Sequence, residues 1–519
     1  MQRKTGAQTD ESVTGAACPL RARRPCASPA LLALLALGSF LGAPGCASSA
    51  TSGAFKSYAA SFGRAEEAML RGDLAGAEAV YGPDLPKEGG AALLANWEMG
   101  SFYQVASKWD ESRSRLDRAD ALSRAIENRP VVSMTQAAQT AGSLLTNDNV
   151  IEFTGDGYER VMSRTLNALN YLRAGDLDGA RVEIRKADEY QQLELRRHED
   201  ELAEARKGAS DADWTAAGEA QKSPEMAARL AGMDTFTAGV KSSFLNPFTY
   251  FLSGLVYELL GEDDNAGIDY RRALELSPRS LALQSAVFSV ALRAGDEERL
   301  RAFREAFDPA VTKGSRRAGK GEGEVVVLFQ AGLVPRKAEI KFPIPIPRAG
   351  VAWVAFPCYV DLDRYHGELE VLAGGARAWS EPVADIGTLA VKALKEKWLP
   401  ITLRQIARVA AKQVAQRQAE IQARKSGGDG AETVASVLGF LYSALSENAD
   451  LRAWYSLPAQ IQAARLVLPV GPQEISLEWV RADGSRVPAT VRVEVAAGRR
   501  SLVSVRSFGR DLTAWSISP

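Results

Sequence analysis

The chain has 519 residues, and its 63 basic and 64 acidic side chains give a formal net charge of −1 at pH 7. This length suits two or three domains, and the near balance of charge gives no general case for nucleic-acid binding. Two histidines and four cysteines nearly exclude histidine triads, multi-histidine metal sites and a disulfide framework. We expect no metal, cofactor, nucleic-acid partner or small-molecule substrate.

The first feature along the chain is an export signal of the lipoprotein type. An arginine cluster precedes the apolar run 30–41, which is shorter than the roughly 20 residues that a membrane-spanning helix needs. The segment 43–46, Ala-Pro-Gly-Cys, resembles the lipobox of bacterial lipoproteins, with alanine and proline where leucine and alanine are commoner. We expect 1–45 to be a signal peptide and Cys46 to be lipidated. The alternative is an ordinary secretory signal that contains a cysteine by coincidence.

A lipid on Cys46 would keep the mature chain on a membrane, because two or three acyl chains hold a protein firmly. Ala47 follows the cysteine, and lipoproteins with a residue other than aspartate there resemble those sorted to the outer membrane. We therefore expect a protein anchored to the outer membrane and facing the periplasm. Residues 47–54 are small and polar, so we expect 46–55 to be a flexible tether.

Residues 56–310 form the next region, in which apolar residues recur at helical spacing between short glycine turns. The stretch 246–278 has the spacing of a tetratricopeptide (TPR) repeat, 167–187 is a second copy, and weaker copies centre on the turns at Gly72 and Gly295. The glycine turns at 261 and 295 are 34 residues apart, which is the length of one such repeat. The residues expected to pack the helices of the best copy are Gly254, Tyr257, Gly261, Ala266, Tyr270, Ala273 and Pro278.

Stacked helix pairs of this kind create extended grooves for peptides or proteins. Aromatic and amide side chains in the earlier copies could line such a groove and bind a partner. The alternative is that the aromatic positions pack between helices. The candidate partner-binding residues are Phe102, Tyr103, Asn167, Asn170 and Tyr171.

A basic, glycine-rich linker at 311–324 marks a change of pattern. In 325–519, short β-branched runs bounded by glycine and proline predict strands. Helical patterns at about 386–446 lie between the strand groups, with Pro400 expected to break the first of them. The fold class is therefore α+β: an N-terminal TPR-like helical region followed by a β-rich domain with inserted helices.

The β-rich region also contains the main candidates for chemistry. Asp361, Asp363, His366 and Glu368 form a polar cluster that could do acid–base work, although a polar turn between strands is the favoured interpretation. Basic residues across 392–425 could form a cationic stripe for an acidic partner or lipid, or a solvated helix face. We expect no catalytic set and a protein that is not an enzyme.

Several segments together resemble an uncharacterised family of bacterial envelope lipoproteins with TPR-like repeats. The most specific is LTNDNVIEFTGDGYERVMSRTLNALNYLRAGDLDGARVEIRKADEYQ at 145–191. The others are EVVVLFQAGLVPRKAEI at 324–340, AFPCY at 355–359 and DLRAWYSLPAQIQAARLVLP at 450–469. Members are often encoded beside a lipoprotein activator of penicillin-binding proteins, so the resemblance implies a link to peptidoglycan synthesis.

The hypothesis that combines these features is a lipid-anchored periplasmic scaffold that binds an envelope protein. Two others remain open. One is an envelope hydrolase or cell-wall-modifying enzyme that uses the acidic cluster, and the other is an accessory lipoprotein of an export complex.

Overall fold

The protein is described by a computed structural model that covers 58–81, 87–128, 152–208, 211–346, 350–360, 362, 365–408 and 448–518, with short pieces at 417–418, 421–422 and 425. The expected signal peptide, Cys46, the tether, Asp361, Asp363 and most of 409–447 lie outside the described residues. Lys56–Pro519 forms one compact unit. Among the described residues, no helix is both long and apolar enough to cross a membrane.

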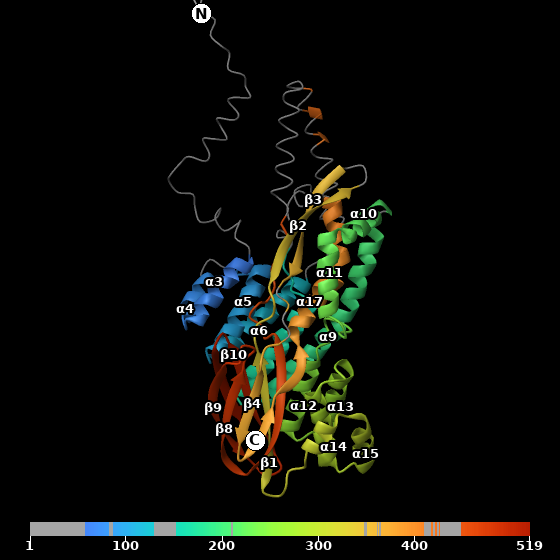
Figure 1. Ribbon diagram of the computed structural model, residues 1–519. Coiled ribbons are helices and arrows are strands. Elements are labelled where there is room, and N and C mark those ends of the chain that lie inside the picture. Colours follow the sequence, from blue (N-terminus) through green and yellow to red (C-terminus); the bar gives the residue numbers. More distant parts are fainter. Residues whose placement is uncertain are drawn as a thin grey trace, which may run out of the picture. The chain divides into compact units, whose positions relative to one another are not determined.

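Helices make up the first part of this unit (Figure 1). They include α3 (Tyr58–Leu70), α4 (Leu74–Val80), α5 (Gly89–Val105), α6 (Trp109–Glu127), α8 (Gly157–Arg173), α9 (Leu177–Gly208), α10 (Asp211–Lys222), α11 (Pro224–Phe236), α12 (Pro247–Leu260), α13 (Asp263–Leu276), α14 (Leu281–Ala294), α15 (Glu297–Ala306) and α16 (Pro309–Gly314). Successive helices pack as hairpins, in particular α5 on α6, α8 on α9 and α12 on α13.

The hairpin of α12 and α13 shows why these residues form a close helix pair. Gly261 ends α12 at φ 82°, a left-handed conformation that favours glycine. A Cβ atom on Gly254 would lie 2.6 Å from Cε1 of Tyr270, so only glycine lets the ring pack this close. Ala266 and Ala273 are fully buried on the same helix as Tyr270. Gly254 therefore lies in the contact between the two helices, and Gly261 forms the turn that joins them.

Strands dominate the second part. They are β1 (Glu322–Ala331), β2 (Lys337–Ile346), β3 (Gly350–Tyr359), β4 (Glu368–Ala373), β5 (Ala376–Trp379), β6 (Glu381–Asp385), β7 (Gln460–Pro469), β8 (Gly471–Val480), β9 (Arg486–Val495), β10 (Arg500–Phe508) and β11 (Asp511–Ile517). One sheet has the order β11-β10-β1-β7-β6 and another the order β5-β4-β8-β9, while β2 and β3 form a separate hairpin. The pairing of β1 with β10 is parallel. The mixed α+β class, with helices first and sheets after, is confirmed.

The five-stranded sheet is buried on both faces, as alternate residues of β1 show. Val325, Val327 and Phe329 belong to the core between the two sheets. Val326 and Leu328 belong to the largest apolar core, which also contains residues of the helices. Because successive side chains of a strand point to opposite faces, β1 lies between a layer of strands and a layer of helices. This explains its unbroken apolar sequence.

The helical and β-rich parts therefore share one core. The expected linker at 311–324 contains the end of α16 and the first residues of β1. Phe62 of α3 and Trp515 of β11 belong to the same apolar cluster. The change of sequence pattern marks a change from helices to strands within one packed body.

The β2–β3 hairpin packs against α10, α11 and a helical segment at 398–408, through an apolar cluster that includes Phe342, Phe356 and Trp398. Figure 1 shows the hairpin beside α10 and α11. α17 (Ile386–Glu396) precedes this segment, and the expected break falls at Lys397. Pro400 lies in the first turn of the segment that follows, where proline is tolerated.

Candidate functional site

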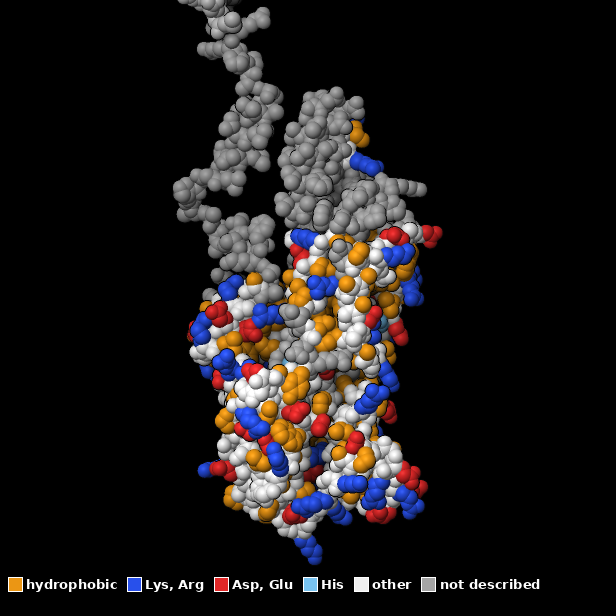
Figure 2. All heavy atoms as spheres, in the orientation of Figure 1, with side chains coloured by type: hydrophobic (Ala, Val, Ile, Leu, Met, Phe, Trp, Pro, Cys, Tyr) orange, Lys and Arg blue, Asp and Glu red, His pale blue; other side chains and the backbone are white. Residues whose placement is uncertain are grey.

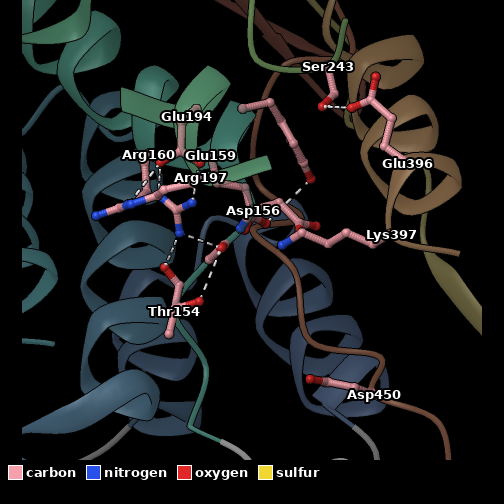
Figure 3. Close-up of polar contacts among 12 residues, drawn as sticks. Thr154, Asp156, Glu159, Arg160, Glu194, Arg197, Ser243, Glu396, Lys397 and Asp450 are labelled. Atoms are coloured by element: carbon pink, nitrogen blue, oxygen red, sulfur yellow. Dashed lines mark hydrogen bonds and ion pairs between the residues drawn. The ribbon is translucent and has the colours of Figure 1, made fainter. Parts of the chain in front are cut away.

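An ionic junction joins the helices to the strands. We use this term for Asp156, Glu159, Arg160, Glu194, Lys337 and Lys397, most of which are drawn in Figure 3. The Lys337 Nζ atom donates to the Arg452 carbonyl oxygen at 3.1 Å, and the Tyr359 ring is buried beside Asp156. Buried ionisable groups with strongly shifted pKa values cluster at functional sites, so the junction is the candidate site.

Asp156 is the centre of the junction. Lys397 Nζ lies 2.8 Å from its Oδ1 atom, and Lys337 Nζ lies 3.5 Å from its Oδ2 atom. Burial alone would raise the pKa of Asp156, but the two ammonium groups outweigh it and hold that pKa well below its usual range. Burial lowers the pKa of Lys337 and Lys397, but Asp156 outweighs it and keeps both raised. At neutral pH the carboxylate is ionised and both lysines are charged.

Arg160 fixes the loop that carries Asp156. Its guanidinium donates to the carbonyl oxygens of Thr154 at 2.8 Å and Gly155 at 2.7 Å. The Nε atom donates to Glu194 of α9 at 2.6 Å, and Figure 3 shows the guanidinium between this carboxylate and the loop. Asp156 also forms a capping box with Glu159 at the start of α8. These contacts leave the Asp156 carboxylate directed at the lysines.

Two buried glutamates hold the loop at 454–456, which precedes β7. Glu159 accepts from the backbone amide of Trp454 at 2.6 Å. Glu98 of α5 accepts from the backbone amides of Tyr455 at 2.8 Å and Ser456 at 3.0 Å. Burial raises the pKa of Glu98 to about 8, against the opposing effect of these hydrogen bonds. Burial, with the nearby Asp156 charge, raises the pKa of Glu159 to about 7.

Aromatic rings pack beside the two glutamates. The rings of Trp97 and Trp454 stack with centroids 5.2 Å apart. Trp97 donates from Nε1 to the Ser163 hydroxyl at 2.9 Å, which ties α5 to α8. Stacked rings add to the free energy gained from burial. This contact therefore holds Trp454 against α5, as the hydrogen bonds of Glu98 and Glu159 hold the loop at 454–456.

A cavity of about 170 Å³ lies beside the junction. Its charged lining residues are Glu152, Asp156, Lys337, Lys397, Arg404, Asp450 and Arg452. Asp450 pairs with Arg452 at 2.7 Å, as Asp156 does with the lysines. An aspartate with a lowered pKa is a weak base, and a lysine with a raised pKa is a weak acid. Asp156 and the two lysines therefore fix charge and position in the cavity wall, while Glu159, whose pKa is raised to about 7, does not line the cavity.

The structure corrects the expectation for the groove residues. Four of them are buried and so do not line an open groove: Phe102, Tyr103, Asn167 and Asn170. Phe102 packs against Phe62 of α3 and Phe508 of β10. The amide side chains of Asn167 and Asn170 are buried because they form hydrogen bonds with side chains of neighbouring helices. These hydrogen bonds include Asn170 to Ser112 at 3.0 Å, Asn167 to Asp117 at 2.9 Å and Gln104 to Asn170 at 2.8 Å. Tyr171 is partly exposed, with the Arg113 guanidinium 5.6 Å from its ring centre.

The described members of the polar cluster before β4 also have structural contacts. The His366 carbonyl oxygen accepts from Trp479 Nε1 at 3.0 Å, and Glu368 is exposed at the start of β4. In the described ranges, no group of three or more His, Cys, Asp or Glu side chains could hold a metal ion. The expected cationic stripe is divided, because Arg408 is buried and Lys397 belongs to the junction.

Sequence reasoning missed the junction. A usable signal for the neighbouring contact with the loop at 454–456 was Glu98, the only acidic residue in the apolar helix sequence of α5. An acid in such a position is buried, and a buried acid needs donors or a cation. Which groups would satisfy it could not be read from the sequence.

No model of a known protein family matches the chain, and a search of the curated proteins finds no significant match.

Proposed function

We propose that this chain is a lipid-anchored scaffold of the bacterial envelope. In this proposal Cys46 holds the chain on the periplasmic side of the outer membrane, and the body beyond residue 55 binds a protein partner. The resemblance to envelope lipoproteins implies a link to peptidoglycan synthesis. The observation that supports the proposal most is the single core shared by helix hairpins and sheets. Such a body presents its surfaces in a fixed geometry, as a scaffold requires.

We also propose that the helix hairpins are TPR-like repeats. The contact of Gly254 with Tyr270 and the burial of Ala266 and Ala273 support this, because small residues at helix crossings are what allow such repeats to stack. The turn glycines Gly261 and Gly295 both have positive φ and end the first helices of successive pairs.

The distribution of charge on the surface and in the junction supports a role in protein binding. Figure 2 shows Lys and Arg interspersed with Asp and Glu on the face in view, without a large region of one sign. Asp156 at the start of α8 pairs with Lys337 at the start of β2 and with Lys397 at the end of α17. Charged pairs of this kind stabilise one relative position of the elements that they join.

The proposal is tested by crosslinking in the intact envelope at native expression, followed by mass spectrometry. We expect a reproducible partner with the native chain and its loss with Cys46→Ser, which removes the lipid attachment. Cys358→Ala is the matched control, because this buried cysteine lies in β3 and the variant should keep the partner. Repeated failure to find any partner would contradict the proposal.

A further inference from the structure

The cavity of about 170 Å³ beside the junction has no role in the scaffold function proposed above. We call it the junction cavity. It lies where the loop before α8 meets β2, β3 and the end of α17, and its apolar lining residues are Phe153, Pro357, Leu394 and Ile401. An apolar cavity of about 150 Å³ in another protein holds one benzene ring. The junction cavity therefore has room for a group of about that size.

The charged side chains that line the junction cavity do not balance. Four are basic and three are acidic, so one positive charge is left over. Asp450 and Arg452 neutralise each other through two contacts, at 2.9 Å and 2.7 Å. Glu152 and Arg404 carry opposite charges. The excess therefore comes from the two lysines that share one aspartate.

These two lysines also have hydrogen-bond donors to spare. An ammonium group has three N–H donors. Lys397 uses one of them for Asp156, as Figure 3 shows, and Lys337 uses two, for Asp156 and for the Arg452 carbonyl oxygen. The remaining donors have no partner among the residues that the structure describes. Because Lys337 is buried and a buried donor without a partner is costly, this wall of the cavity favours an anion.

A carboxylate is the anion that fits this wall best. It carries one negative charge, which equals the excess, whereas a phosphate monoester carries about 1.5 to 2 at neutral pH. Ammonium groups donate to a carboxylate in charge-assisted hydrogen bonds, which are stronger than neutral ones. The apolar lining favours an acid whose carboxylate is attached to a ring or to a branched carbon chain.

We propose that the junction cavity binds a small organic acid, with its carboxylate at Lys337 and Lys397 and its apolar group against Phe153, Leu394 and Ile401. The proposal goes beyond the scaffold function and does not depend on it. It departs from the expectation, drawn from the sequence, that the chain has no small-molecule partner. A ligand in this place would contact α17, β2 and the loop before α8 together, so binding would also stabilise the junction.

The test is saturation-transfer NMR with the full mature chain and benzoate as the probe. Benzamide is the neutral control of the same shape. We expect saturable binding of benzoate and binding of benzamide that is about tenfold weaker. No binding of benzoate, or equal binding of the two, would overturn the proposal. Inorganic phosphate at the same concentration should not displace benzoate, and displacement would overturn the assignment to a carboxylate.

A lysine variant locates the binding. Lys397→Gln should weaken the binding of benzoate about tenfold, and Asp156 keeps Lys337 as a partner in this variant. Lys395→Gln is the matched control and should bind as the native chain does. The Lys395 side chain is 35% exposed against 33% for Lys397, but it pairs with Asp234 and does not line the cavity.

A second variant tests the cavity without a change of charge. Ile401 is partly buried and lines the cavity, so Ile401→Phe adds volume to the wall and should also weaken benzoate about tenfold. Thermal unfolding checks that each variant remains folded. Native affinity for benzoate in both Lys397→Gln and Ile401→Phe would place the acid elsewhere and would overturn the proposal. Such a failure would leave the crosslinking test of the scaffold function unaffected.

Discussion

At the scale of single residues, buried ionisable side chains hold the elements together by binding partners on other elements. Asp156 has two lysines as partners, while Glu98 and Glu159 have backbone amides. Because a buried charged or polar group without a partner is costly, each of these groups requires its partner from the other element to be in place.

Replacement of Asp156 by asparagine should strongly destabilise the protein. The variant leaves Lys337 and Lys397 without their carboxylate, and loss of one member of a buried pair costs about 3–5 kcal/mol. Since the pKa of Asp156 is lowered in the folded state, its contribution is present above its ordinary value of 3.8 and is lost as the pH falls below it. Urea unfolding measures the effect. Asp178→Asn, in an exposed pair, is the control and should cost less than about 1 kcal/mol. Equal losses would show that the junction is unimportant for stability.

Glu98 should give the opposite dependence on pH. Its folded-state pKa of about 8 lies above the ordinary 4.5, so its contribution to stability is complete below pH 4.5 and is lost as the pH rises through 8. We expect the free energy of unfolding to fall across this window and Glu98→Gln to flatten the fall by a few kcal/mol. Unfolding in urea at several pH values tests this, with the exposed Glu67→Gln as control. A slope unchanged in Glu98→Gln would contradict it.

At the scale of elements, close helix crossings and strand registers hold the helices and strands in place. α12 and α13 approach at Gly254, and β1 pairs with β7 in one continuous register. These features depend on which residue meets which partner.

The crossing of α12 and α13 can be tested with one substitution. Gly254→Val places a side chain where a Cβ atom alone would lie 2.6 Å from the Tyr270 ring. We expect a loss of about 1–3 kcal/mol from overpacking. Gly218→Ala in α10 meets open space and should instead stabilise the protein by about 0.5–1 kcal/mol, because alanine favours a helix. Thermal unfolding distinguishes them, and a neutral Gly254→Val would argue against a close crossing.

The sequence was sufficient for the order of helices and strands and for the close-packing role of Gly254, because both depend on local spacing. It was insufficient for the junction, since Lys337 and Lys397 lie 181 and 241 positions from Asp156 along the chain. The groove prediction was wrong for Asn167 and Asn170 because an amide on a helix can face either a neighbouring helix or solvent, and the spacing is the same in both cases.

At the scale of the whole molecule, the main finding is that helices and sheets form one body. Glu258 of α12 is buried, and Arg465 of β7 supplies one of its charged partners at 2.9 Å. Trp454 stacks on Trp97 of α5. Neither part keeps these partners when the other is removed.

A chain limited to residues 56–310 should therefore fail to unfold cooperatively. It would expose the apolar face that packs on β1 and leave Glu258 without Arg465. Circular dichroism during heating measures this, with residues 56–519 as the reference. A fragment with a cooperative transition close to that of the reference would show that the helical region is an independent domain.

The central claim is that this body is held at a membrane through Cys46. Metabolic labelling with a radioactive fatty acid, followed by immunoprecipitation, tests it most directly. We predict label in the native chain and in Cys358→Ala, and none in Cys46→Ala. Label that persists in Cys46→Ala, or native protein without label, would contradict the account.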